Sequence, residues 1–180
     1  MQYSNIVFRA VGPEHRELLA EGFARLSDEA RAMRFFVAKP RLTEGELRYL
    51  SEPDGVDHFA LGAASLHPGG VLEGLGVARY VRSHRDPGAA HVAVTVIDAA
   101  QGSGLGVRLL RRLALLASIR GVERFLFQVR PENVAMRTLL ASRRVPLELE
   151  DRTLVARADV TTVARFRSRR DPARSALRRA

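Results

Sequence analysis

The stretch VTVIDAAQGSGLGVRLL, residues 94–110, decides the fold. An apolar run rich in β-branched residues ends at Ile97, three glycines follow at alternate positions, and a helical pattern rich in Leu and Arg begins at Leu105. The first turn of a helix carries unpaired N–H groups at the positive end of its dipole, and glycines let a ligand approach the backbone. The stretch therefore predicts an anion-binding loop between a strand and a helix. A tight strand-to-helix connection without a ligand is the alternative.

The glycine spacing sets two familiar phosphate-binding loops aside. A Walker loop ends in Gly-Lys-Ser or Gly-Lys-Thr, whereas this loop continues with Leu105, Gly106 and Val107. A dinucleotide-binding loop has Gly-x-Gly-x-x-Gly in an early strand–helix–strand unit, whereas these glycines follow a Gly-x-Gly-x-Gly pattern in the middle of the chain. The loop alone therefore predicts an anion without naming the ligand.

The patterns on both sides of the loop predict one mixed α/β domain. The strand 91–97 is almost continuously apolar, so we expect it to be buried on both faces. Gly121 is expected to end the helix that follows the loop. The other expected strands are residues 6–11, 57–66, 71–82, 122–130, 147–150 and 153–160, and further helices are expected from residue 13, over 28–36, from 44 and over 131–144.

Composition limits the class of protein. The chain has 180 residues, 46% of them hydrophobic, which suits one domain with its own core. No secretory signal or membrane span is visible, so we expect a cytoplasmic protein that does not enter a membrane. The absence of cysteine excludes disulfides, thiolate nucleophiles and Cys-based metal sites.

The net charge of +9 is unevenly distributed. Residues 165–180 hold seven arginines and one aspartate and so carry +6 of it. We expect a domain over residues 1–164 followed by a basic, flexible tail over 165–180. Zinc-ligand spacing and aromatic pairs on neighbouring strands are missing, so nucleic acid is not the favoured partner.

Several separated motifs resemble the GNAT (GCN5-related) N-acetyltransferases. Residues 101–106, QGSGLG, are similar to the family's acyl-CoA pyrophosphate loop, Gln/Arg-x-x-Gly-x-Gly/Ala. Downstream, the Leu-rich helix, the run RFLFQV and Asn133 follow in the family's order. Upstream, LSDEARAMRFF, RLTEGEL and DGVDHFALGAAS resemble segments of bacterial protein-lysine acetyltransferases. The resemblance extends from about Ile6 to about Val160.

This resemblance implies a GNAT-type fold, with a mixed, mostly antiparallel sheet whose central strands splay apart between flanking helices. It implies acetyl-CoA as co-substrate and no metal. The backbone of Val94, Thr95 and Val96 would pair with the pantetheine arm, and Asn133 would lie beside that arm. The pyrophosphate would be held by the amides of Gln101, Gly102, Ser103, Gly104, Leu105 and Gly106. Arg108, Arg111 or Arg112 would meet the outer phosphate or form a solvated helix face.

The catalytic residues depart from the family's pattern. The family often has a Tyr that acts as the general acid seven residues after the position of Asn133. This chain has Leu140 there. The lysine-acetyltransferase type has a Glu at the start of the central strand, where this chain has His91. An ordinary imidazole titrates near ~6.5, so His91 is a candidate base, although it can equally be a strand-start histidine without a catalytic role. Glu73 is the second candidate base, or else an exposed strand carboxylate.

The remaining polar residues have simpler expected roles. Asp98 is expected to cap the turn before the loop, and Asp57 and His58 to form a hydrogen-bonded turn pair. His67 and His84 lie in turns and should face solvent. No spacing of histidines and carboxylates predicts a metal site.

The sequence therefore predicts an acyl-CoA-dependent N-acyltransferase, acetyl being the expected group. The acceptor is an amine on a protein lysine, a protein N-terminus or a small molecule. Direct attack on the thioester is expected, since no cysteine can carry an acyl intermediate. The alternative is an acyl-CoA-binding regulatory domain whose basic tail contacts a partner or nucleic acid. The sequence leaves the acyl length and the choice between monomer and homodimer open.

Overall fold

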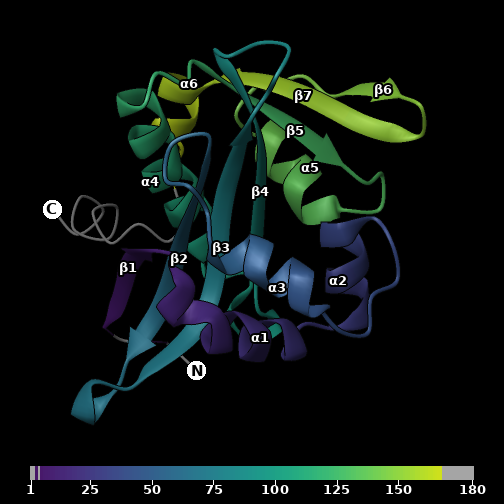
Figure 1. Cartoon of the computed structure of the whole chain (residues 1–180). Helices are drawn as coiled ribbons and strands as arrows, with labels where there is room; N and C mark the ends of the chain where they lie inside the picture. The colour runs from purple at the N-terminus through teal and green to yellow at the C-terminus, as the bar shows by residue number, and fades with distance from the viewer. Residues whose placement is uncertain (1–2, 4, 168–180) are drawn as a thin grey trace, which may run out of the picture.

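The computed structural model describes residue 3 and residues 5–167 (Figure 1). These residues form a seven-stranded sheet in the order β1-β2-β3-β4-β5-β7-β6. Neighbouring strands are antiparallel except β4 and β5, which are parallel. The strands are β1 (Ile6–Ala10), β2 (His58–Leu66), β3 (Leu72–Arg82), β4 (Ala89–Val96), β5 (Arg124–Val129), β6 (Glu148–Glu150) and β7 (Thr153–Asp159). The predicted mixed, mostly antiparallel α/β fold is confirmed.

Local capping explains where two of the helices begin. The Ser27 side chain accepts a hydrogen bond from the amide of Ala30, and Thr43 and Glu46 form a reciprocal capping box. The helices are α1 (Arg16–Ala24), α2 (Asp28–Phe35), α3 (Glu44–Ser51), α4 (Leu105–Ile119), α5 (Val134–Ala141) and α6 (Val160–Ala164), with short 3-10 turns η1 (Pro13–His15), η2 (Pro68–Gly70) and η3 (Asp98–Ala100). The sequence did not predict α6, because five residues are too few for a helical period to show.

Helices cover both faces of the sheet. A β-carbon added at Gly76 of β3 would approach Leu109 of α4, so this face of β3 lies against α4. The Arg79 side chain, at the opposite parity of the same strand, reaches α3, where it donates to the carbonyl of Leu50. Helix α1 packs beside α3 on that second face.

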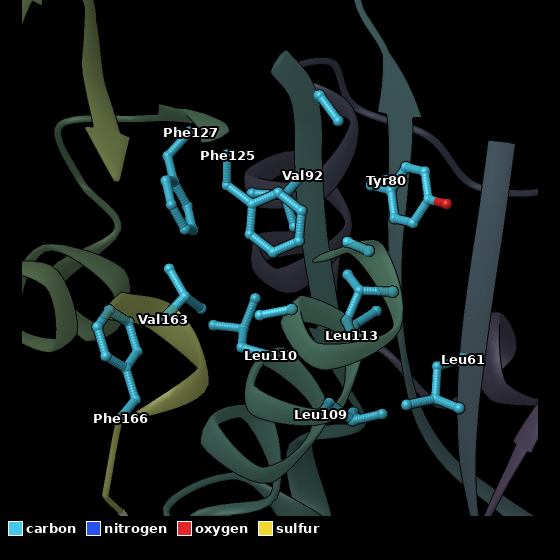
Figure 2. Packing of buried hydrophobic residues seen from close by; sticks show 14 of the residues in the cluster. Leu61, Tyr80, Val92, Leu109, Leu110, Leu113, Phe125, Phe127, Val163 and Phe166 are labelled. Carbon is cyan, nitrogen blue, oxygen red and sulfur yellow. The ribbon is translucent and has the colours of Figure 1, made fainter. Parts of the chain in front are cut away.

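The core lies between the sheet and α4 (Figure 2). Leu109, Leu110 and Leu113 of α4 are fully buried, and they lie among the aromatic rings of Tyr80 and Phe125. Leucines at positions i, i+1 and i+4 form one apolar side of the helix, so burial against the sheet stabilises it. This packing fixes the start of α4, and with it the preceding loop, against β4.

The packed part of the chain continues past the predicted domain boundary at residue 164. Phe166 is 2% exposed and lies beside Val163 of α6 in the core. Most of the predicted basic tail, residues 168–180, lies outside the described residues.

The central strands β4 and β5 separate part-way along their length. Their parallel pairing ends at Val92 and Phe127, whereas β4 continues beside β3 to Val96. The prediction that this strand is buried on both faces was wrong: His91 is exposed and residues 93–96 are half-buried. Val94 and Val96 still pack against the core, while a cleft rather than another strand borders the second half of β4.

Candidate functional site

A cleft of about 770 Å³ opens where β4 and β5 separate. It is lined by α2, the second half of β4, the glycine loop with the first turn of α4, and α5. Its volume falls within the range of about 300–1,000 Å³ that is typical of small-molecule sites. Four segments that are distant in sequence therefore form one site that can hold a ligand the size of a nucleotide.

The glycine loop presents its backbone to this cleft. Gly102 and Gly104 have φ angles of +67° and +84°, which side chains disfavour. Within the part of the chain that is described, no acceptor pairs with the amides of Gly102, Gly104 or Gly106. These amides stand at the N-terminus of the 15-residue helix α4, where the dipole favours an anion. The loop is therefore suited to bind a phosphate group.

The side chains of the loop hold its shape. The Ser103 Oγ donates to the carbonyl of Ala100 at 2.5 Å and accepts from the amide of Leu105 at 3.3 Å. The Gln101 Nε2 donates to the carbonyl of Val96 and to Asp98 Oδ1, both at 3.1 Å. Ser103 is thus the one predicted cofactor-binding residue whose atoms do not line the cleft; its contribution is to the loop's conformation.

The edge of β4 forms one wall of the cleft. Val94, Thr95 and Val96 line it beyond the point where β5 departs. A β-carbon at Gly106 would lie 3.7 Å from Val96 Cγ2, an ordinary contact distance, so the first turn of α4 lies beside this strand. The cleft therefore combines a free strand edge with a helix N-terminus.

Asn133 lies on the opposite wall and begins α5. Its Oδ1 accepts a hydrogen bond from the amide of Met136 at 3.0 Å. The predicted helix start at Pro131 was two to three residues early, because the cap is Asn133 and the helix begins at Val134. Asn133 and Met136 both line the cleft.

Asp98 links the loop to α2. Its Oδ2 accepts from the Ser27 amide at 2.6 Å and its Oδ1 from the Ser27 hydroxyl at 3.1 Å. The carboxylate was expected to cap only its own turn. It joins two segments 71 positions apart, and so holds the start of α2 beside the loop.

The candidate base His91 lies next to the inner end of the cleft rather than in its lining. It stands on β4 between Val81 of β3 and Leu126 of β5, and its side chain is exposed. Ala93, two residues further along β4, lines the cleft, and alternate residues of a strand share a face. His91 therefore lies about 7 Å along the strand from the cleft wall, on the same face.

The second candidate, Glu73, is not brought to the site. It lies near the hairpin end of β3, where Arg25 donates to its Oε1 at 2.6 Å and His67 contacts its Oε2 at 2.9 Å. The hydrogen bond from His67, followed by the contact with Arg25, lowers the pKa of Glu73. A carboxylate held in its charged form far from the loop is poorly placed to accept a proton from an acceptor amine.

The expected turn pair of Asp57 and His58 was wrong. Asp57 forms an ion pair with Arg82 at 2.8 Å, whereas His58 Nε2 contacts Arg79 at 2.9 Å. The two residues are adjacent at the start of an extended strand, so their side chains diverge. Burial, followed by repulsion from Arg79, lowers the pKa of His58 to about 4. His67 and His84 are exposed as expected, although His67 also contacts Glu73.

The arginines of α4 do not line the cleft. The guanidinium groups of Arg108 and Arg112 lie over the Phe8 ring, and Arg111 donates to the carbonyl of Ala164. Two other arginines line the cleft, Arg34 of α2 and Arg143 after α5. No local sequence pattern indicates either residue, because each is brought to the cleft by tertiary packing.

No cluster of three or more His, Cys, Asp or Glu side chains suited to a metal ion occurs among the described residues. No helix within residues 5–167 is long and apolar enough to cross a membrane.

Comparisons with known proteins bear on this geometry. No family model matches the sequence. The chain is 37% identical over 133 residues to acetyltransferase Pat from Mycolicibacterium smegmatis, and the match covers 73% of this chain and 38% of that protein. The GNAT domain of S. lividans PAT shares the structure with a TM-score of 0.76 at 29% identity, over 84% of this chain and 89% of that one. This chain is a GNAT domain similar to those of bacterial protein acetyltransferases.

The GNAT domain spans about two fifths of the length of the curated Pat relative. A Salmonella typhimurium protein that was solved with its cofactor acetyl-CoA has the same fold, with a TM-score of 0.65 at 17% identity over 87% of this chain and 95% of that one. The predicted resemblance to the GNAT family is thus confirmed.

Proposed function

We propose that this GNAT domain transfers an acyl group, in the first instance acetyl, from acyl-CoA to an amine. The observation that carries the proposal is the set of unpaired loop amides at the mouth of the split between β4 and β5. A pyrophosphate satisfies these amides, and an extended arm bearing its own amides can pair with the free edge of β4. Coenzyme A has both parts. The acetyltransferase relatives support the same assignment.

The residues present fit coenzyme A part by part. The amides of Gly102, Gly104 and Gly106 would hold the pyrophosphate, and Arg143 is a cationic side chain of the same cleft lining. The pantetheine arm would run along Val94, Thr95 and Val96, opposite Asn133. The arm would run from Val96 toward Ala93, which is three residues and about 10 Å away along the strand. The thioester at the end of the arm would therefore lie near the inner end of the cleft.

Transfer to an amine needs a base, because an ammonium group has no lone pair for attack. In this proposal His91 accepts the proton, directly or through one water, as the amine attacks the thioester carbon. The C–S bond then breaks, the thiolate of coenzyme A leaves and takes a proton, and the amide product remains. Leu140 is buried and apolar, so the proton for the thiolate comes from solvent or from the protonated His91.

The acceptor can be found with a direct assay. Release of the coenzyme A thiol from acetyl-CoA is measured against a panel of small amines, peptide N-termini and lysine peptides. The chain has no cysteine, so a thiol reagent reports only the product. Acceptor-dependent release supports the transferase. Saturable acetyl-CoA binding without release on any acceptor would instead support the acyl-CoA-binding regulatory domain, with the basic segment 165–180 as its contact region.

A further inference from the structure

Two arginines on the α3 side of the sheet lack an acidic partner. Arg79 is 4% exposed, and its guanidinium donates to His58 Nε2 at 2.9 Å and to the Leu50 carbonyl at 3.1 Å. The guanidinium of Arg34 makes neither a hydrogen bond nor a salt bridge with any described residue, and it lies over the ring of Phe35 at 4.9 Å. Arg79 is buried and Arg34 half-buried, and cations removed from water are ordinarily paired with carboxylates, so this pair is unusual.

The pair lies at the inner end of the cleft. Arg34 and Thr95 line both the cleft and a second, apolar cavity of about 110 Å³ between the sheet and α1. Arg79 lines the second cavity and faces Ala93 across the β3–β4 pair, and Ala93 lines the cleft. The two guanidinium groups therefore stand where the cleft meets the cavity, at the level of β4 where the thioester would lie.

The electrostatics at this junction favour an added anion. Burial, followed by repulsion from Arg34, lowers the pKa of Arg79 to about 10, and burial lowers that of Arg34. The shift at Arg79 reflects the cost of holding its charge away from water and near Arg34, and the shift at Arg34 reflects its partial burial. A carboxylate beside Arg34 offsets that cost and gains charge-assisted hydrogen bonds.

The acidic side chains of the cleft do not supply this anion. Asp98 accepts from Ser27, and Glu132 pairs with Arg130 at 3.4 Å. Glu29 is exposed in the first turn of α2, five positions before Arg34, so the two point to different sides of the helix. An anion at this place would therefore come from a ligand.

We propose that Arg34, supported by Arg79, forms a subsite for a carboxylate beside the reacting thioester. The guanidinium groups would hold the charge, and the small, apolar cavity beside them has room for only a few heavy atoms, so the carboxylate should sit on a short chain. That carboxylate belongs either to the acceptor amine, as in an amino acid or a lysine next to an acidic residue, or to the acyl group of a dicarboxylic acyl-CoA. Acceptors rich in positive charge are disfavoured at the same place.

This inference rests on the proposed transferase activity, and its test compares matched substrates that differ in one carboxylate. The acceptor arm compares glutamate with glutamine, and an Asp-Lys peptide with its Asn-Lys counterpart, using acetyl-CoA. The acyl arm compares succinyl-CoA with butyryl-CoA on one neutral amine. In at least one arm, kcat/KM should be about tenfold or more higher for the substrate that carries the carboxylate than for its matched partner. The reason is that only the carboxylate can accept a charge-assisted hydrogen bond from Arg34.

Arg34→Gln should reduce that preference to near unity, and Arg34→Lys should restore part of it. The matched control is Arg48→Gln, which changes an exposed arginine of α3 outside the cleft. This variant should keep the full preference for the carboxylate. The Tm of Arg34→Gln should equal or exceed that of the unmodified chain, since the change removes an unpaired charge. A purely structural role for Arg34 would lower Tm and affect both members of each pair equally.

The outcomes separate this inference from the transferase proposal. Transfer without any preference for the carboxylate in either arm, or a preference that survives Arg34→Gln, overturns the subsite and leaves the transferase intact. Absence of transfer to every acceptor overturns the transferase. In that case the subsite is judged by binding alone: calorimetry should show succinyl-CoA binding about tenfold more tightly than butyryl-CoA only while Arg34 is present, and equal affinities overturn it.

Discussion

The two ends of the cleft are built in different ways. At the outer end, one continuous segment from Val94 to Leu110 supplies a strand edge, a loop and a helix N-terminus, and the binding groups are backbone amides. At the inner end, the candidate residues Arg34, Arg79 and His91 come from three elements, and the groups they offer are side chains. A backbone site leaves a contiguous pattern in the sequence, whereas a side-chain site assembled by tertiary packing leaves none.

This difference separates what binds from what reacts. The outer end can hold the constant part of an acyl-CoA, the pyrophosphate and the pantetheine arm. In the proposed function, the inner end contacts the parts that vary, the acyl group and the acceptor. Changes at the inner end should therefore alter turnover and selectivity, while changes at the outer end should alter acyl-CoA affinity. The predictions that follow test this division.

The largest effect is expected for His91→Ala. Loss of a general base typically costs about 10²- to 10⁴-fold, so kcat should fall at least about a hundredfold. The affinity for acetyl-CoA should stay within about twofold of the unmodified value, because His91 lies outside the cleft lining. Steady-state kinetics and calorimetry measure the two quantities separately.

The control for His91→Ala is His84→Ala, which changes an exposed turn histidine. It should leave both quantities unchanged. An unaltered kcat in His91→Ala would remove this residue from the mechanism, and an equal loss of acetyl-CoA affinity would show that the two ends of the cleft are not separable.

The next effect concerns the outer end. Gly106 is the second residue of α4 and lines the cleft. Gly106→Glu places a carboxylate beside the expected pyrophosphate, and like charges about 4 Å apart near a protein surface repel by about 4 kcal/mol. The Kd for acetyl-CoA should therefore rise by about a hundredfold or more. The helix itself should tolerate the change, because acidic residues suit a helix N-terminus.

Gly45 offers a matched control, since it is the second residue of α3 and has open space around it. Gly45→Glu introduces the same charge at the equivalent helix position away from the cleft, and acetyl-CoA affinity should be unchanged. Similar affinities for the two variants would mean that the N-terminus of α4 does not hold the phosphates.

The smallest effect is a pH dependence of stability from the inner end. The folded chain lowers the pKa of His58 from its ordinary 6.5 to about 4. Between these values the unfolded chain binds a proton that the folded chain does not, so the free energy of unfolding falls as pH drops from about 6.5 to 4. This group alone contributes a loss on the order of 2 kcal/mol over that window.

His58→Gln should reduce the slope of the unfolding free energy against pH by an amount that corresponds to about one bound proton. The Gln amide oxygen can still accept from Arg79, but it does not titrate. His84→Gln should leave the slope as it is. Urea unfolding at several pH values between 4 and 7 measures the effect. The same slope in His58→Gln would show that another group titrates in this window.

Much of the fold could be predicted from local patterns. Ser27 and Thr43 are the caps that their sequence positions indicated, and Gly121, with a φ of +77°, follows the end of α4. The positive φ angles of Gly102 and Gly104 agree with their expected role in the loop. Each of these features depends on neighbours within a few residues, which is why the sequence shows them.

The remaining features depend on contacts between distant segments. The apolar pattern of β4 indicated full burial, but the departure of β5 after Phe127 exposes its edge to a cleft. Arg34 and Arg79 are 45 positions apart, and nothing in either local sequence shows that they meet. The link from Asp98 to Ser27 is equally invisible in the sequence, although both residues appeared there as caps.

The central claim is that the backbone of the glycine loop holds the phosphates of coenzyme A. Titration of the ¹⁵N-labelled protein with coenzyme A, followed through its amide resonances, tests this most directly. The amides of Gly102, Gly104 and Gly106 should shift together and saturate, whereas those of Gly55, Gly69 and Gly70, which lie outside the cleft, should stay in place. Saturable binding that leaves the three loop amides unmoved would contradict the claim.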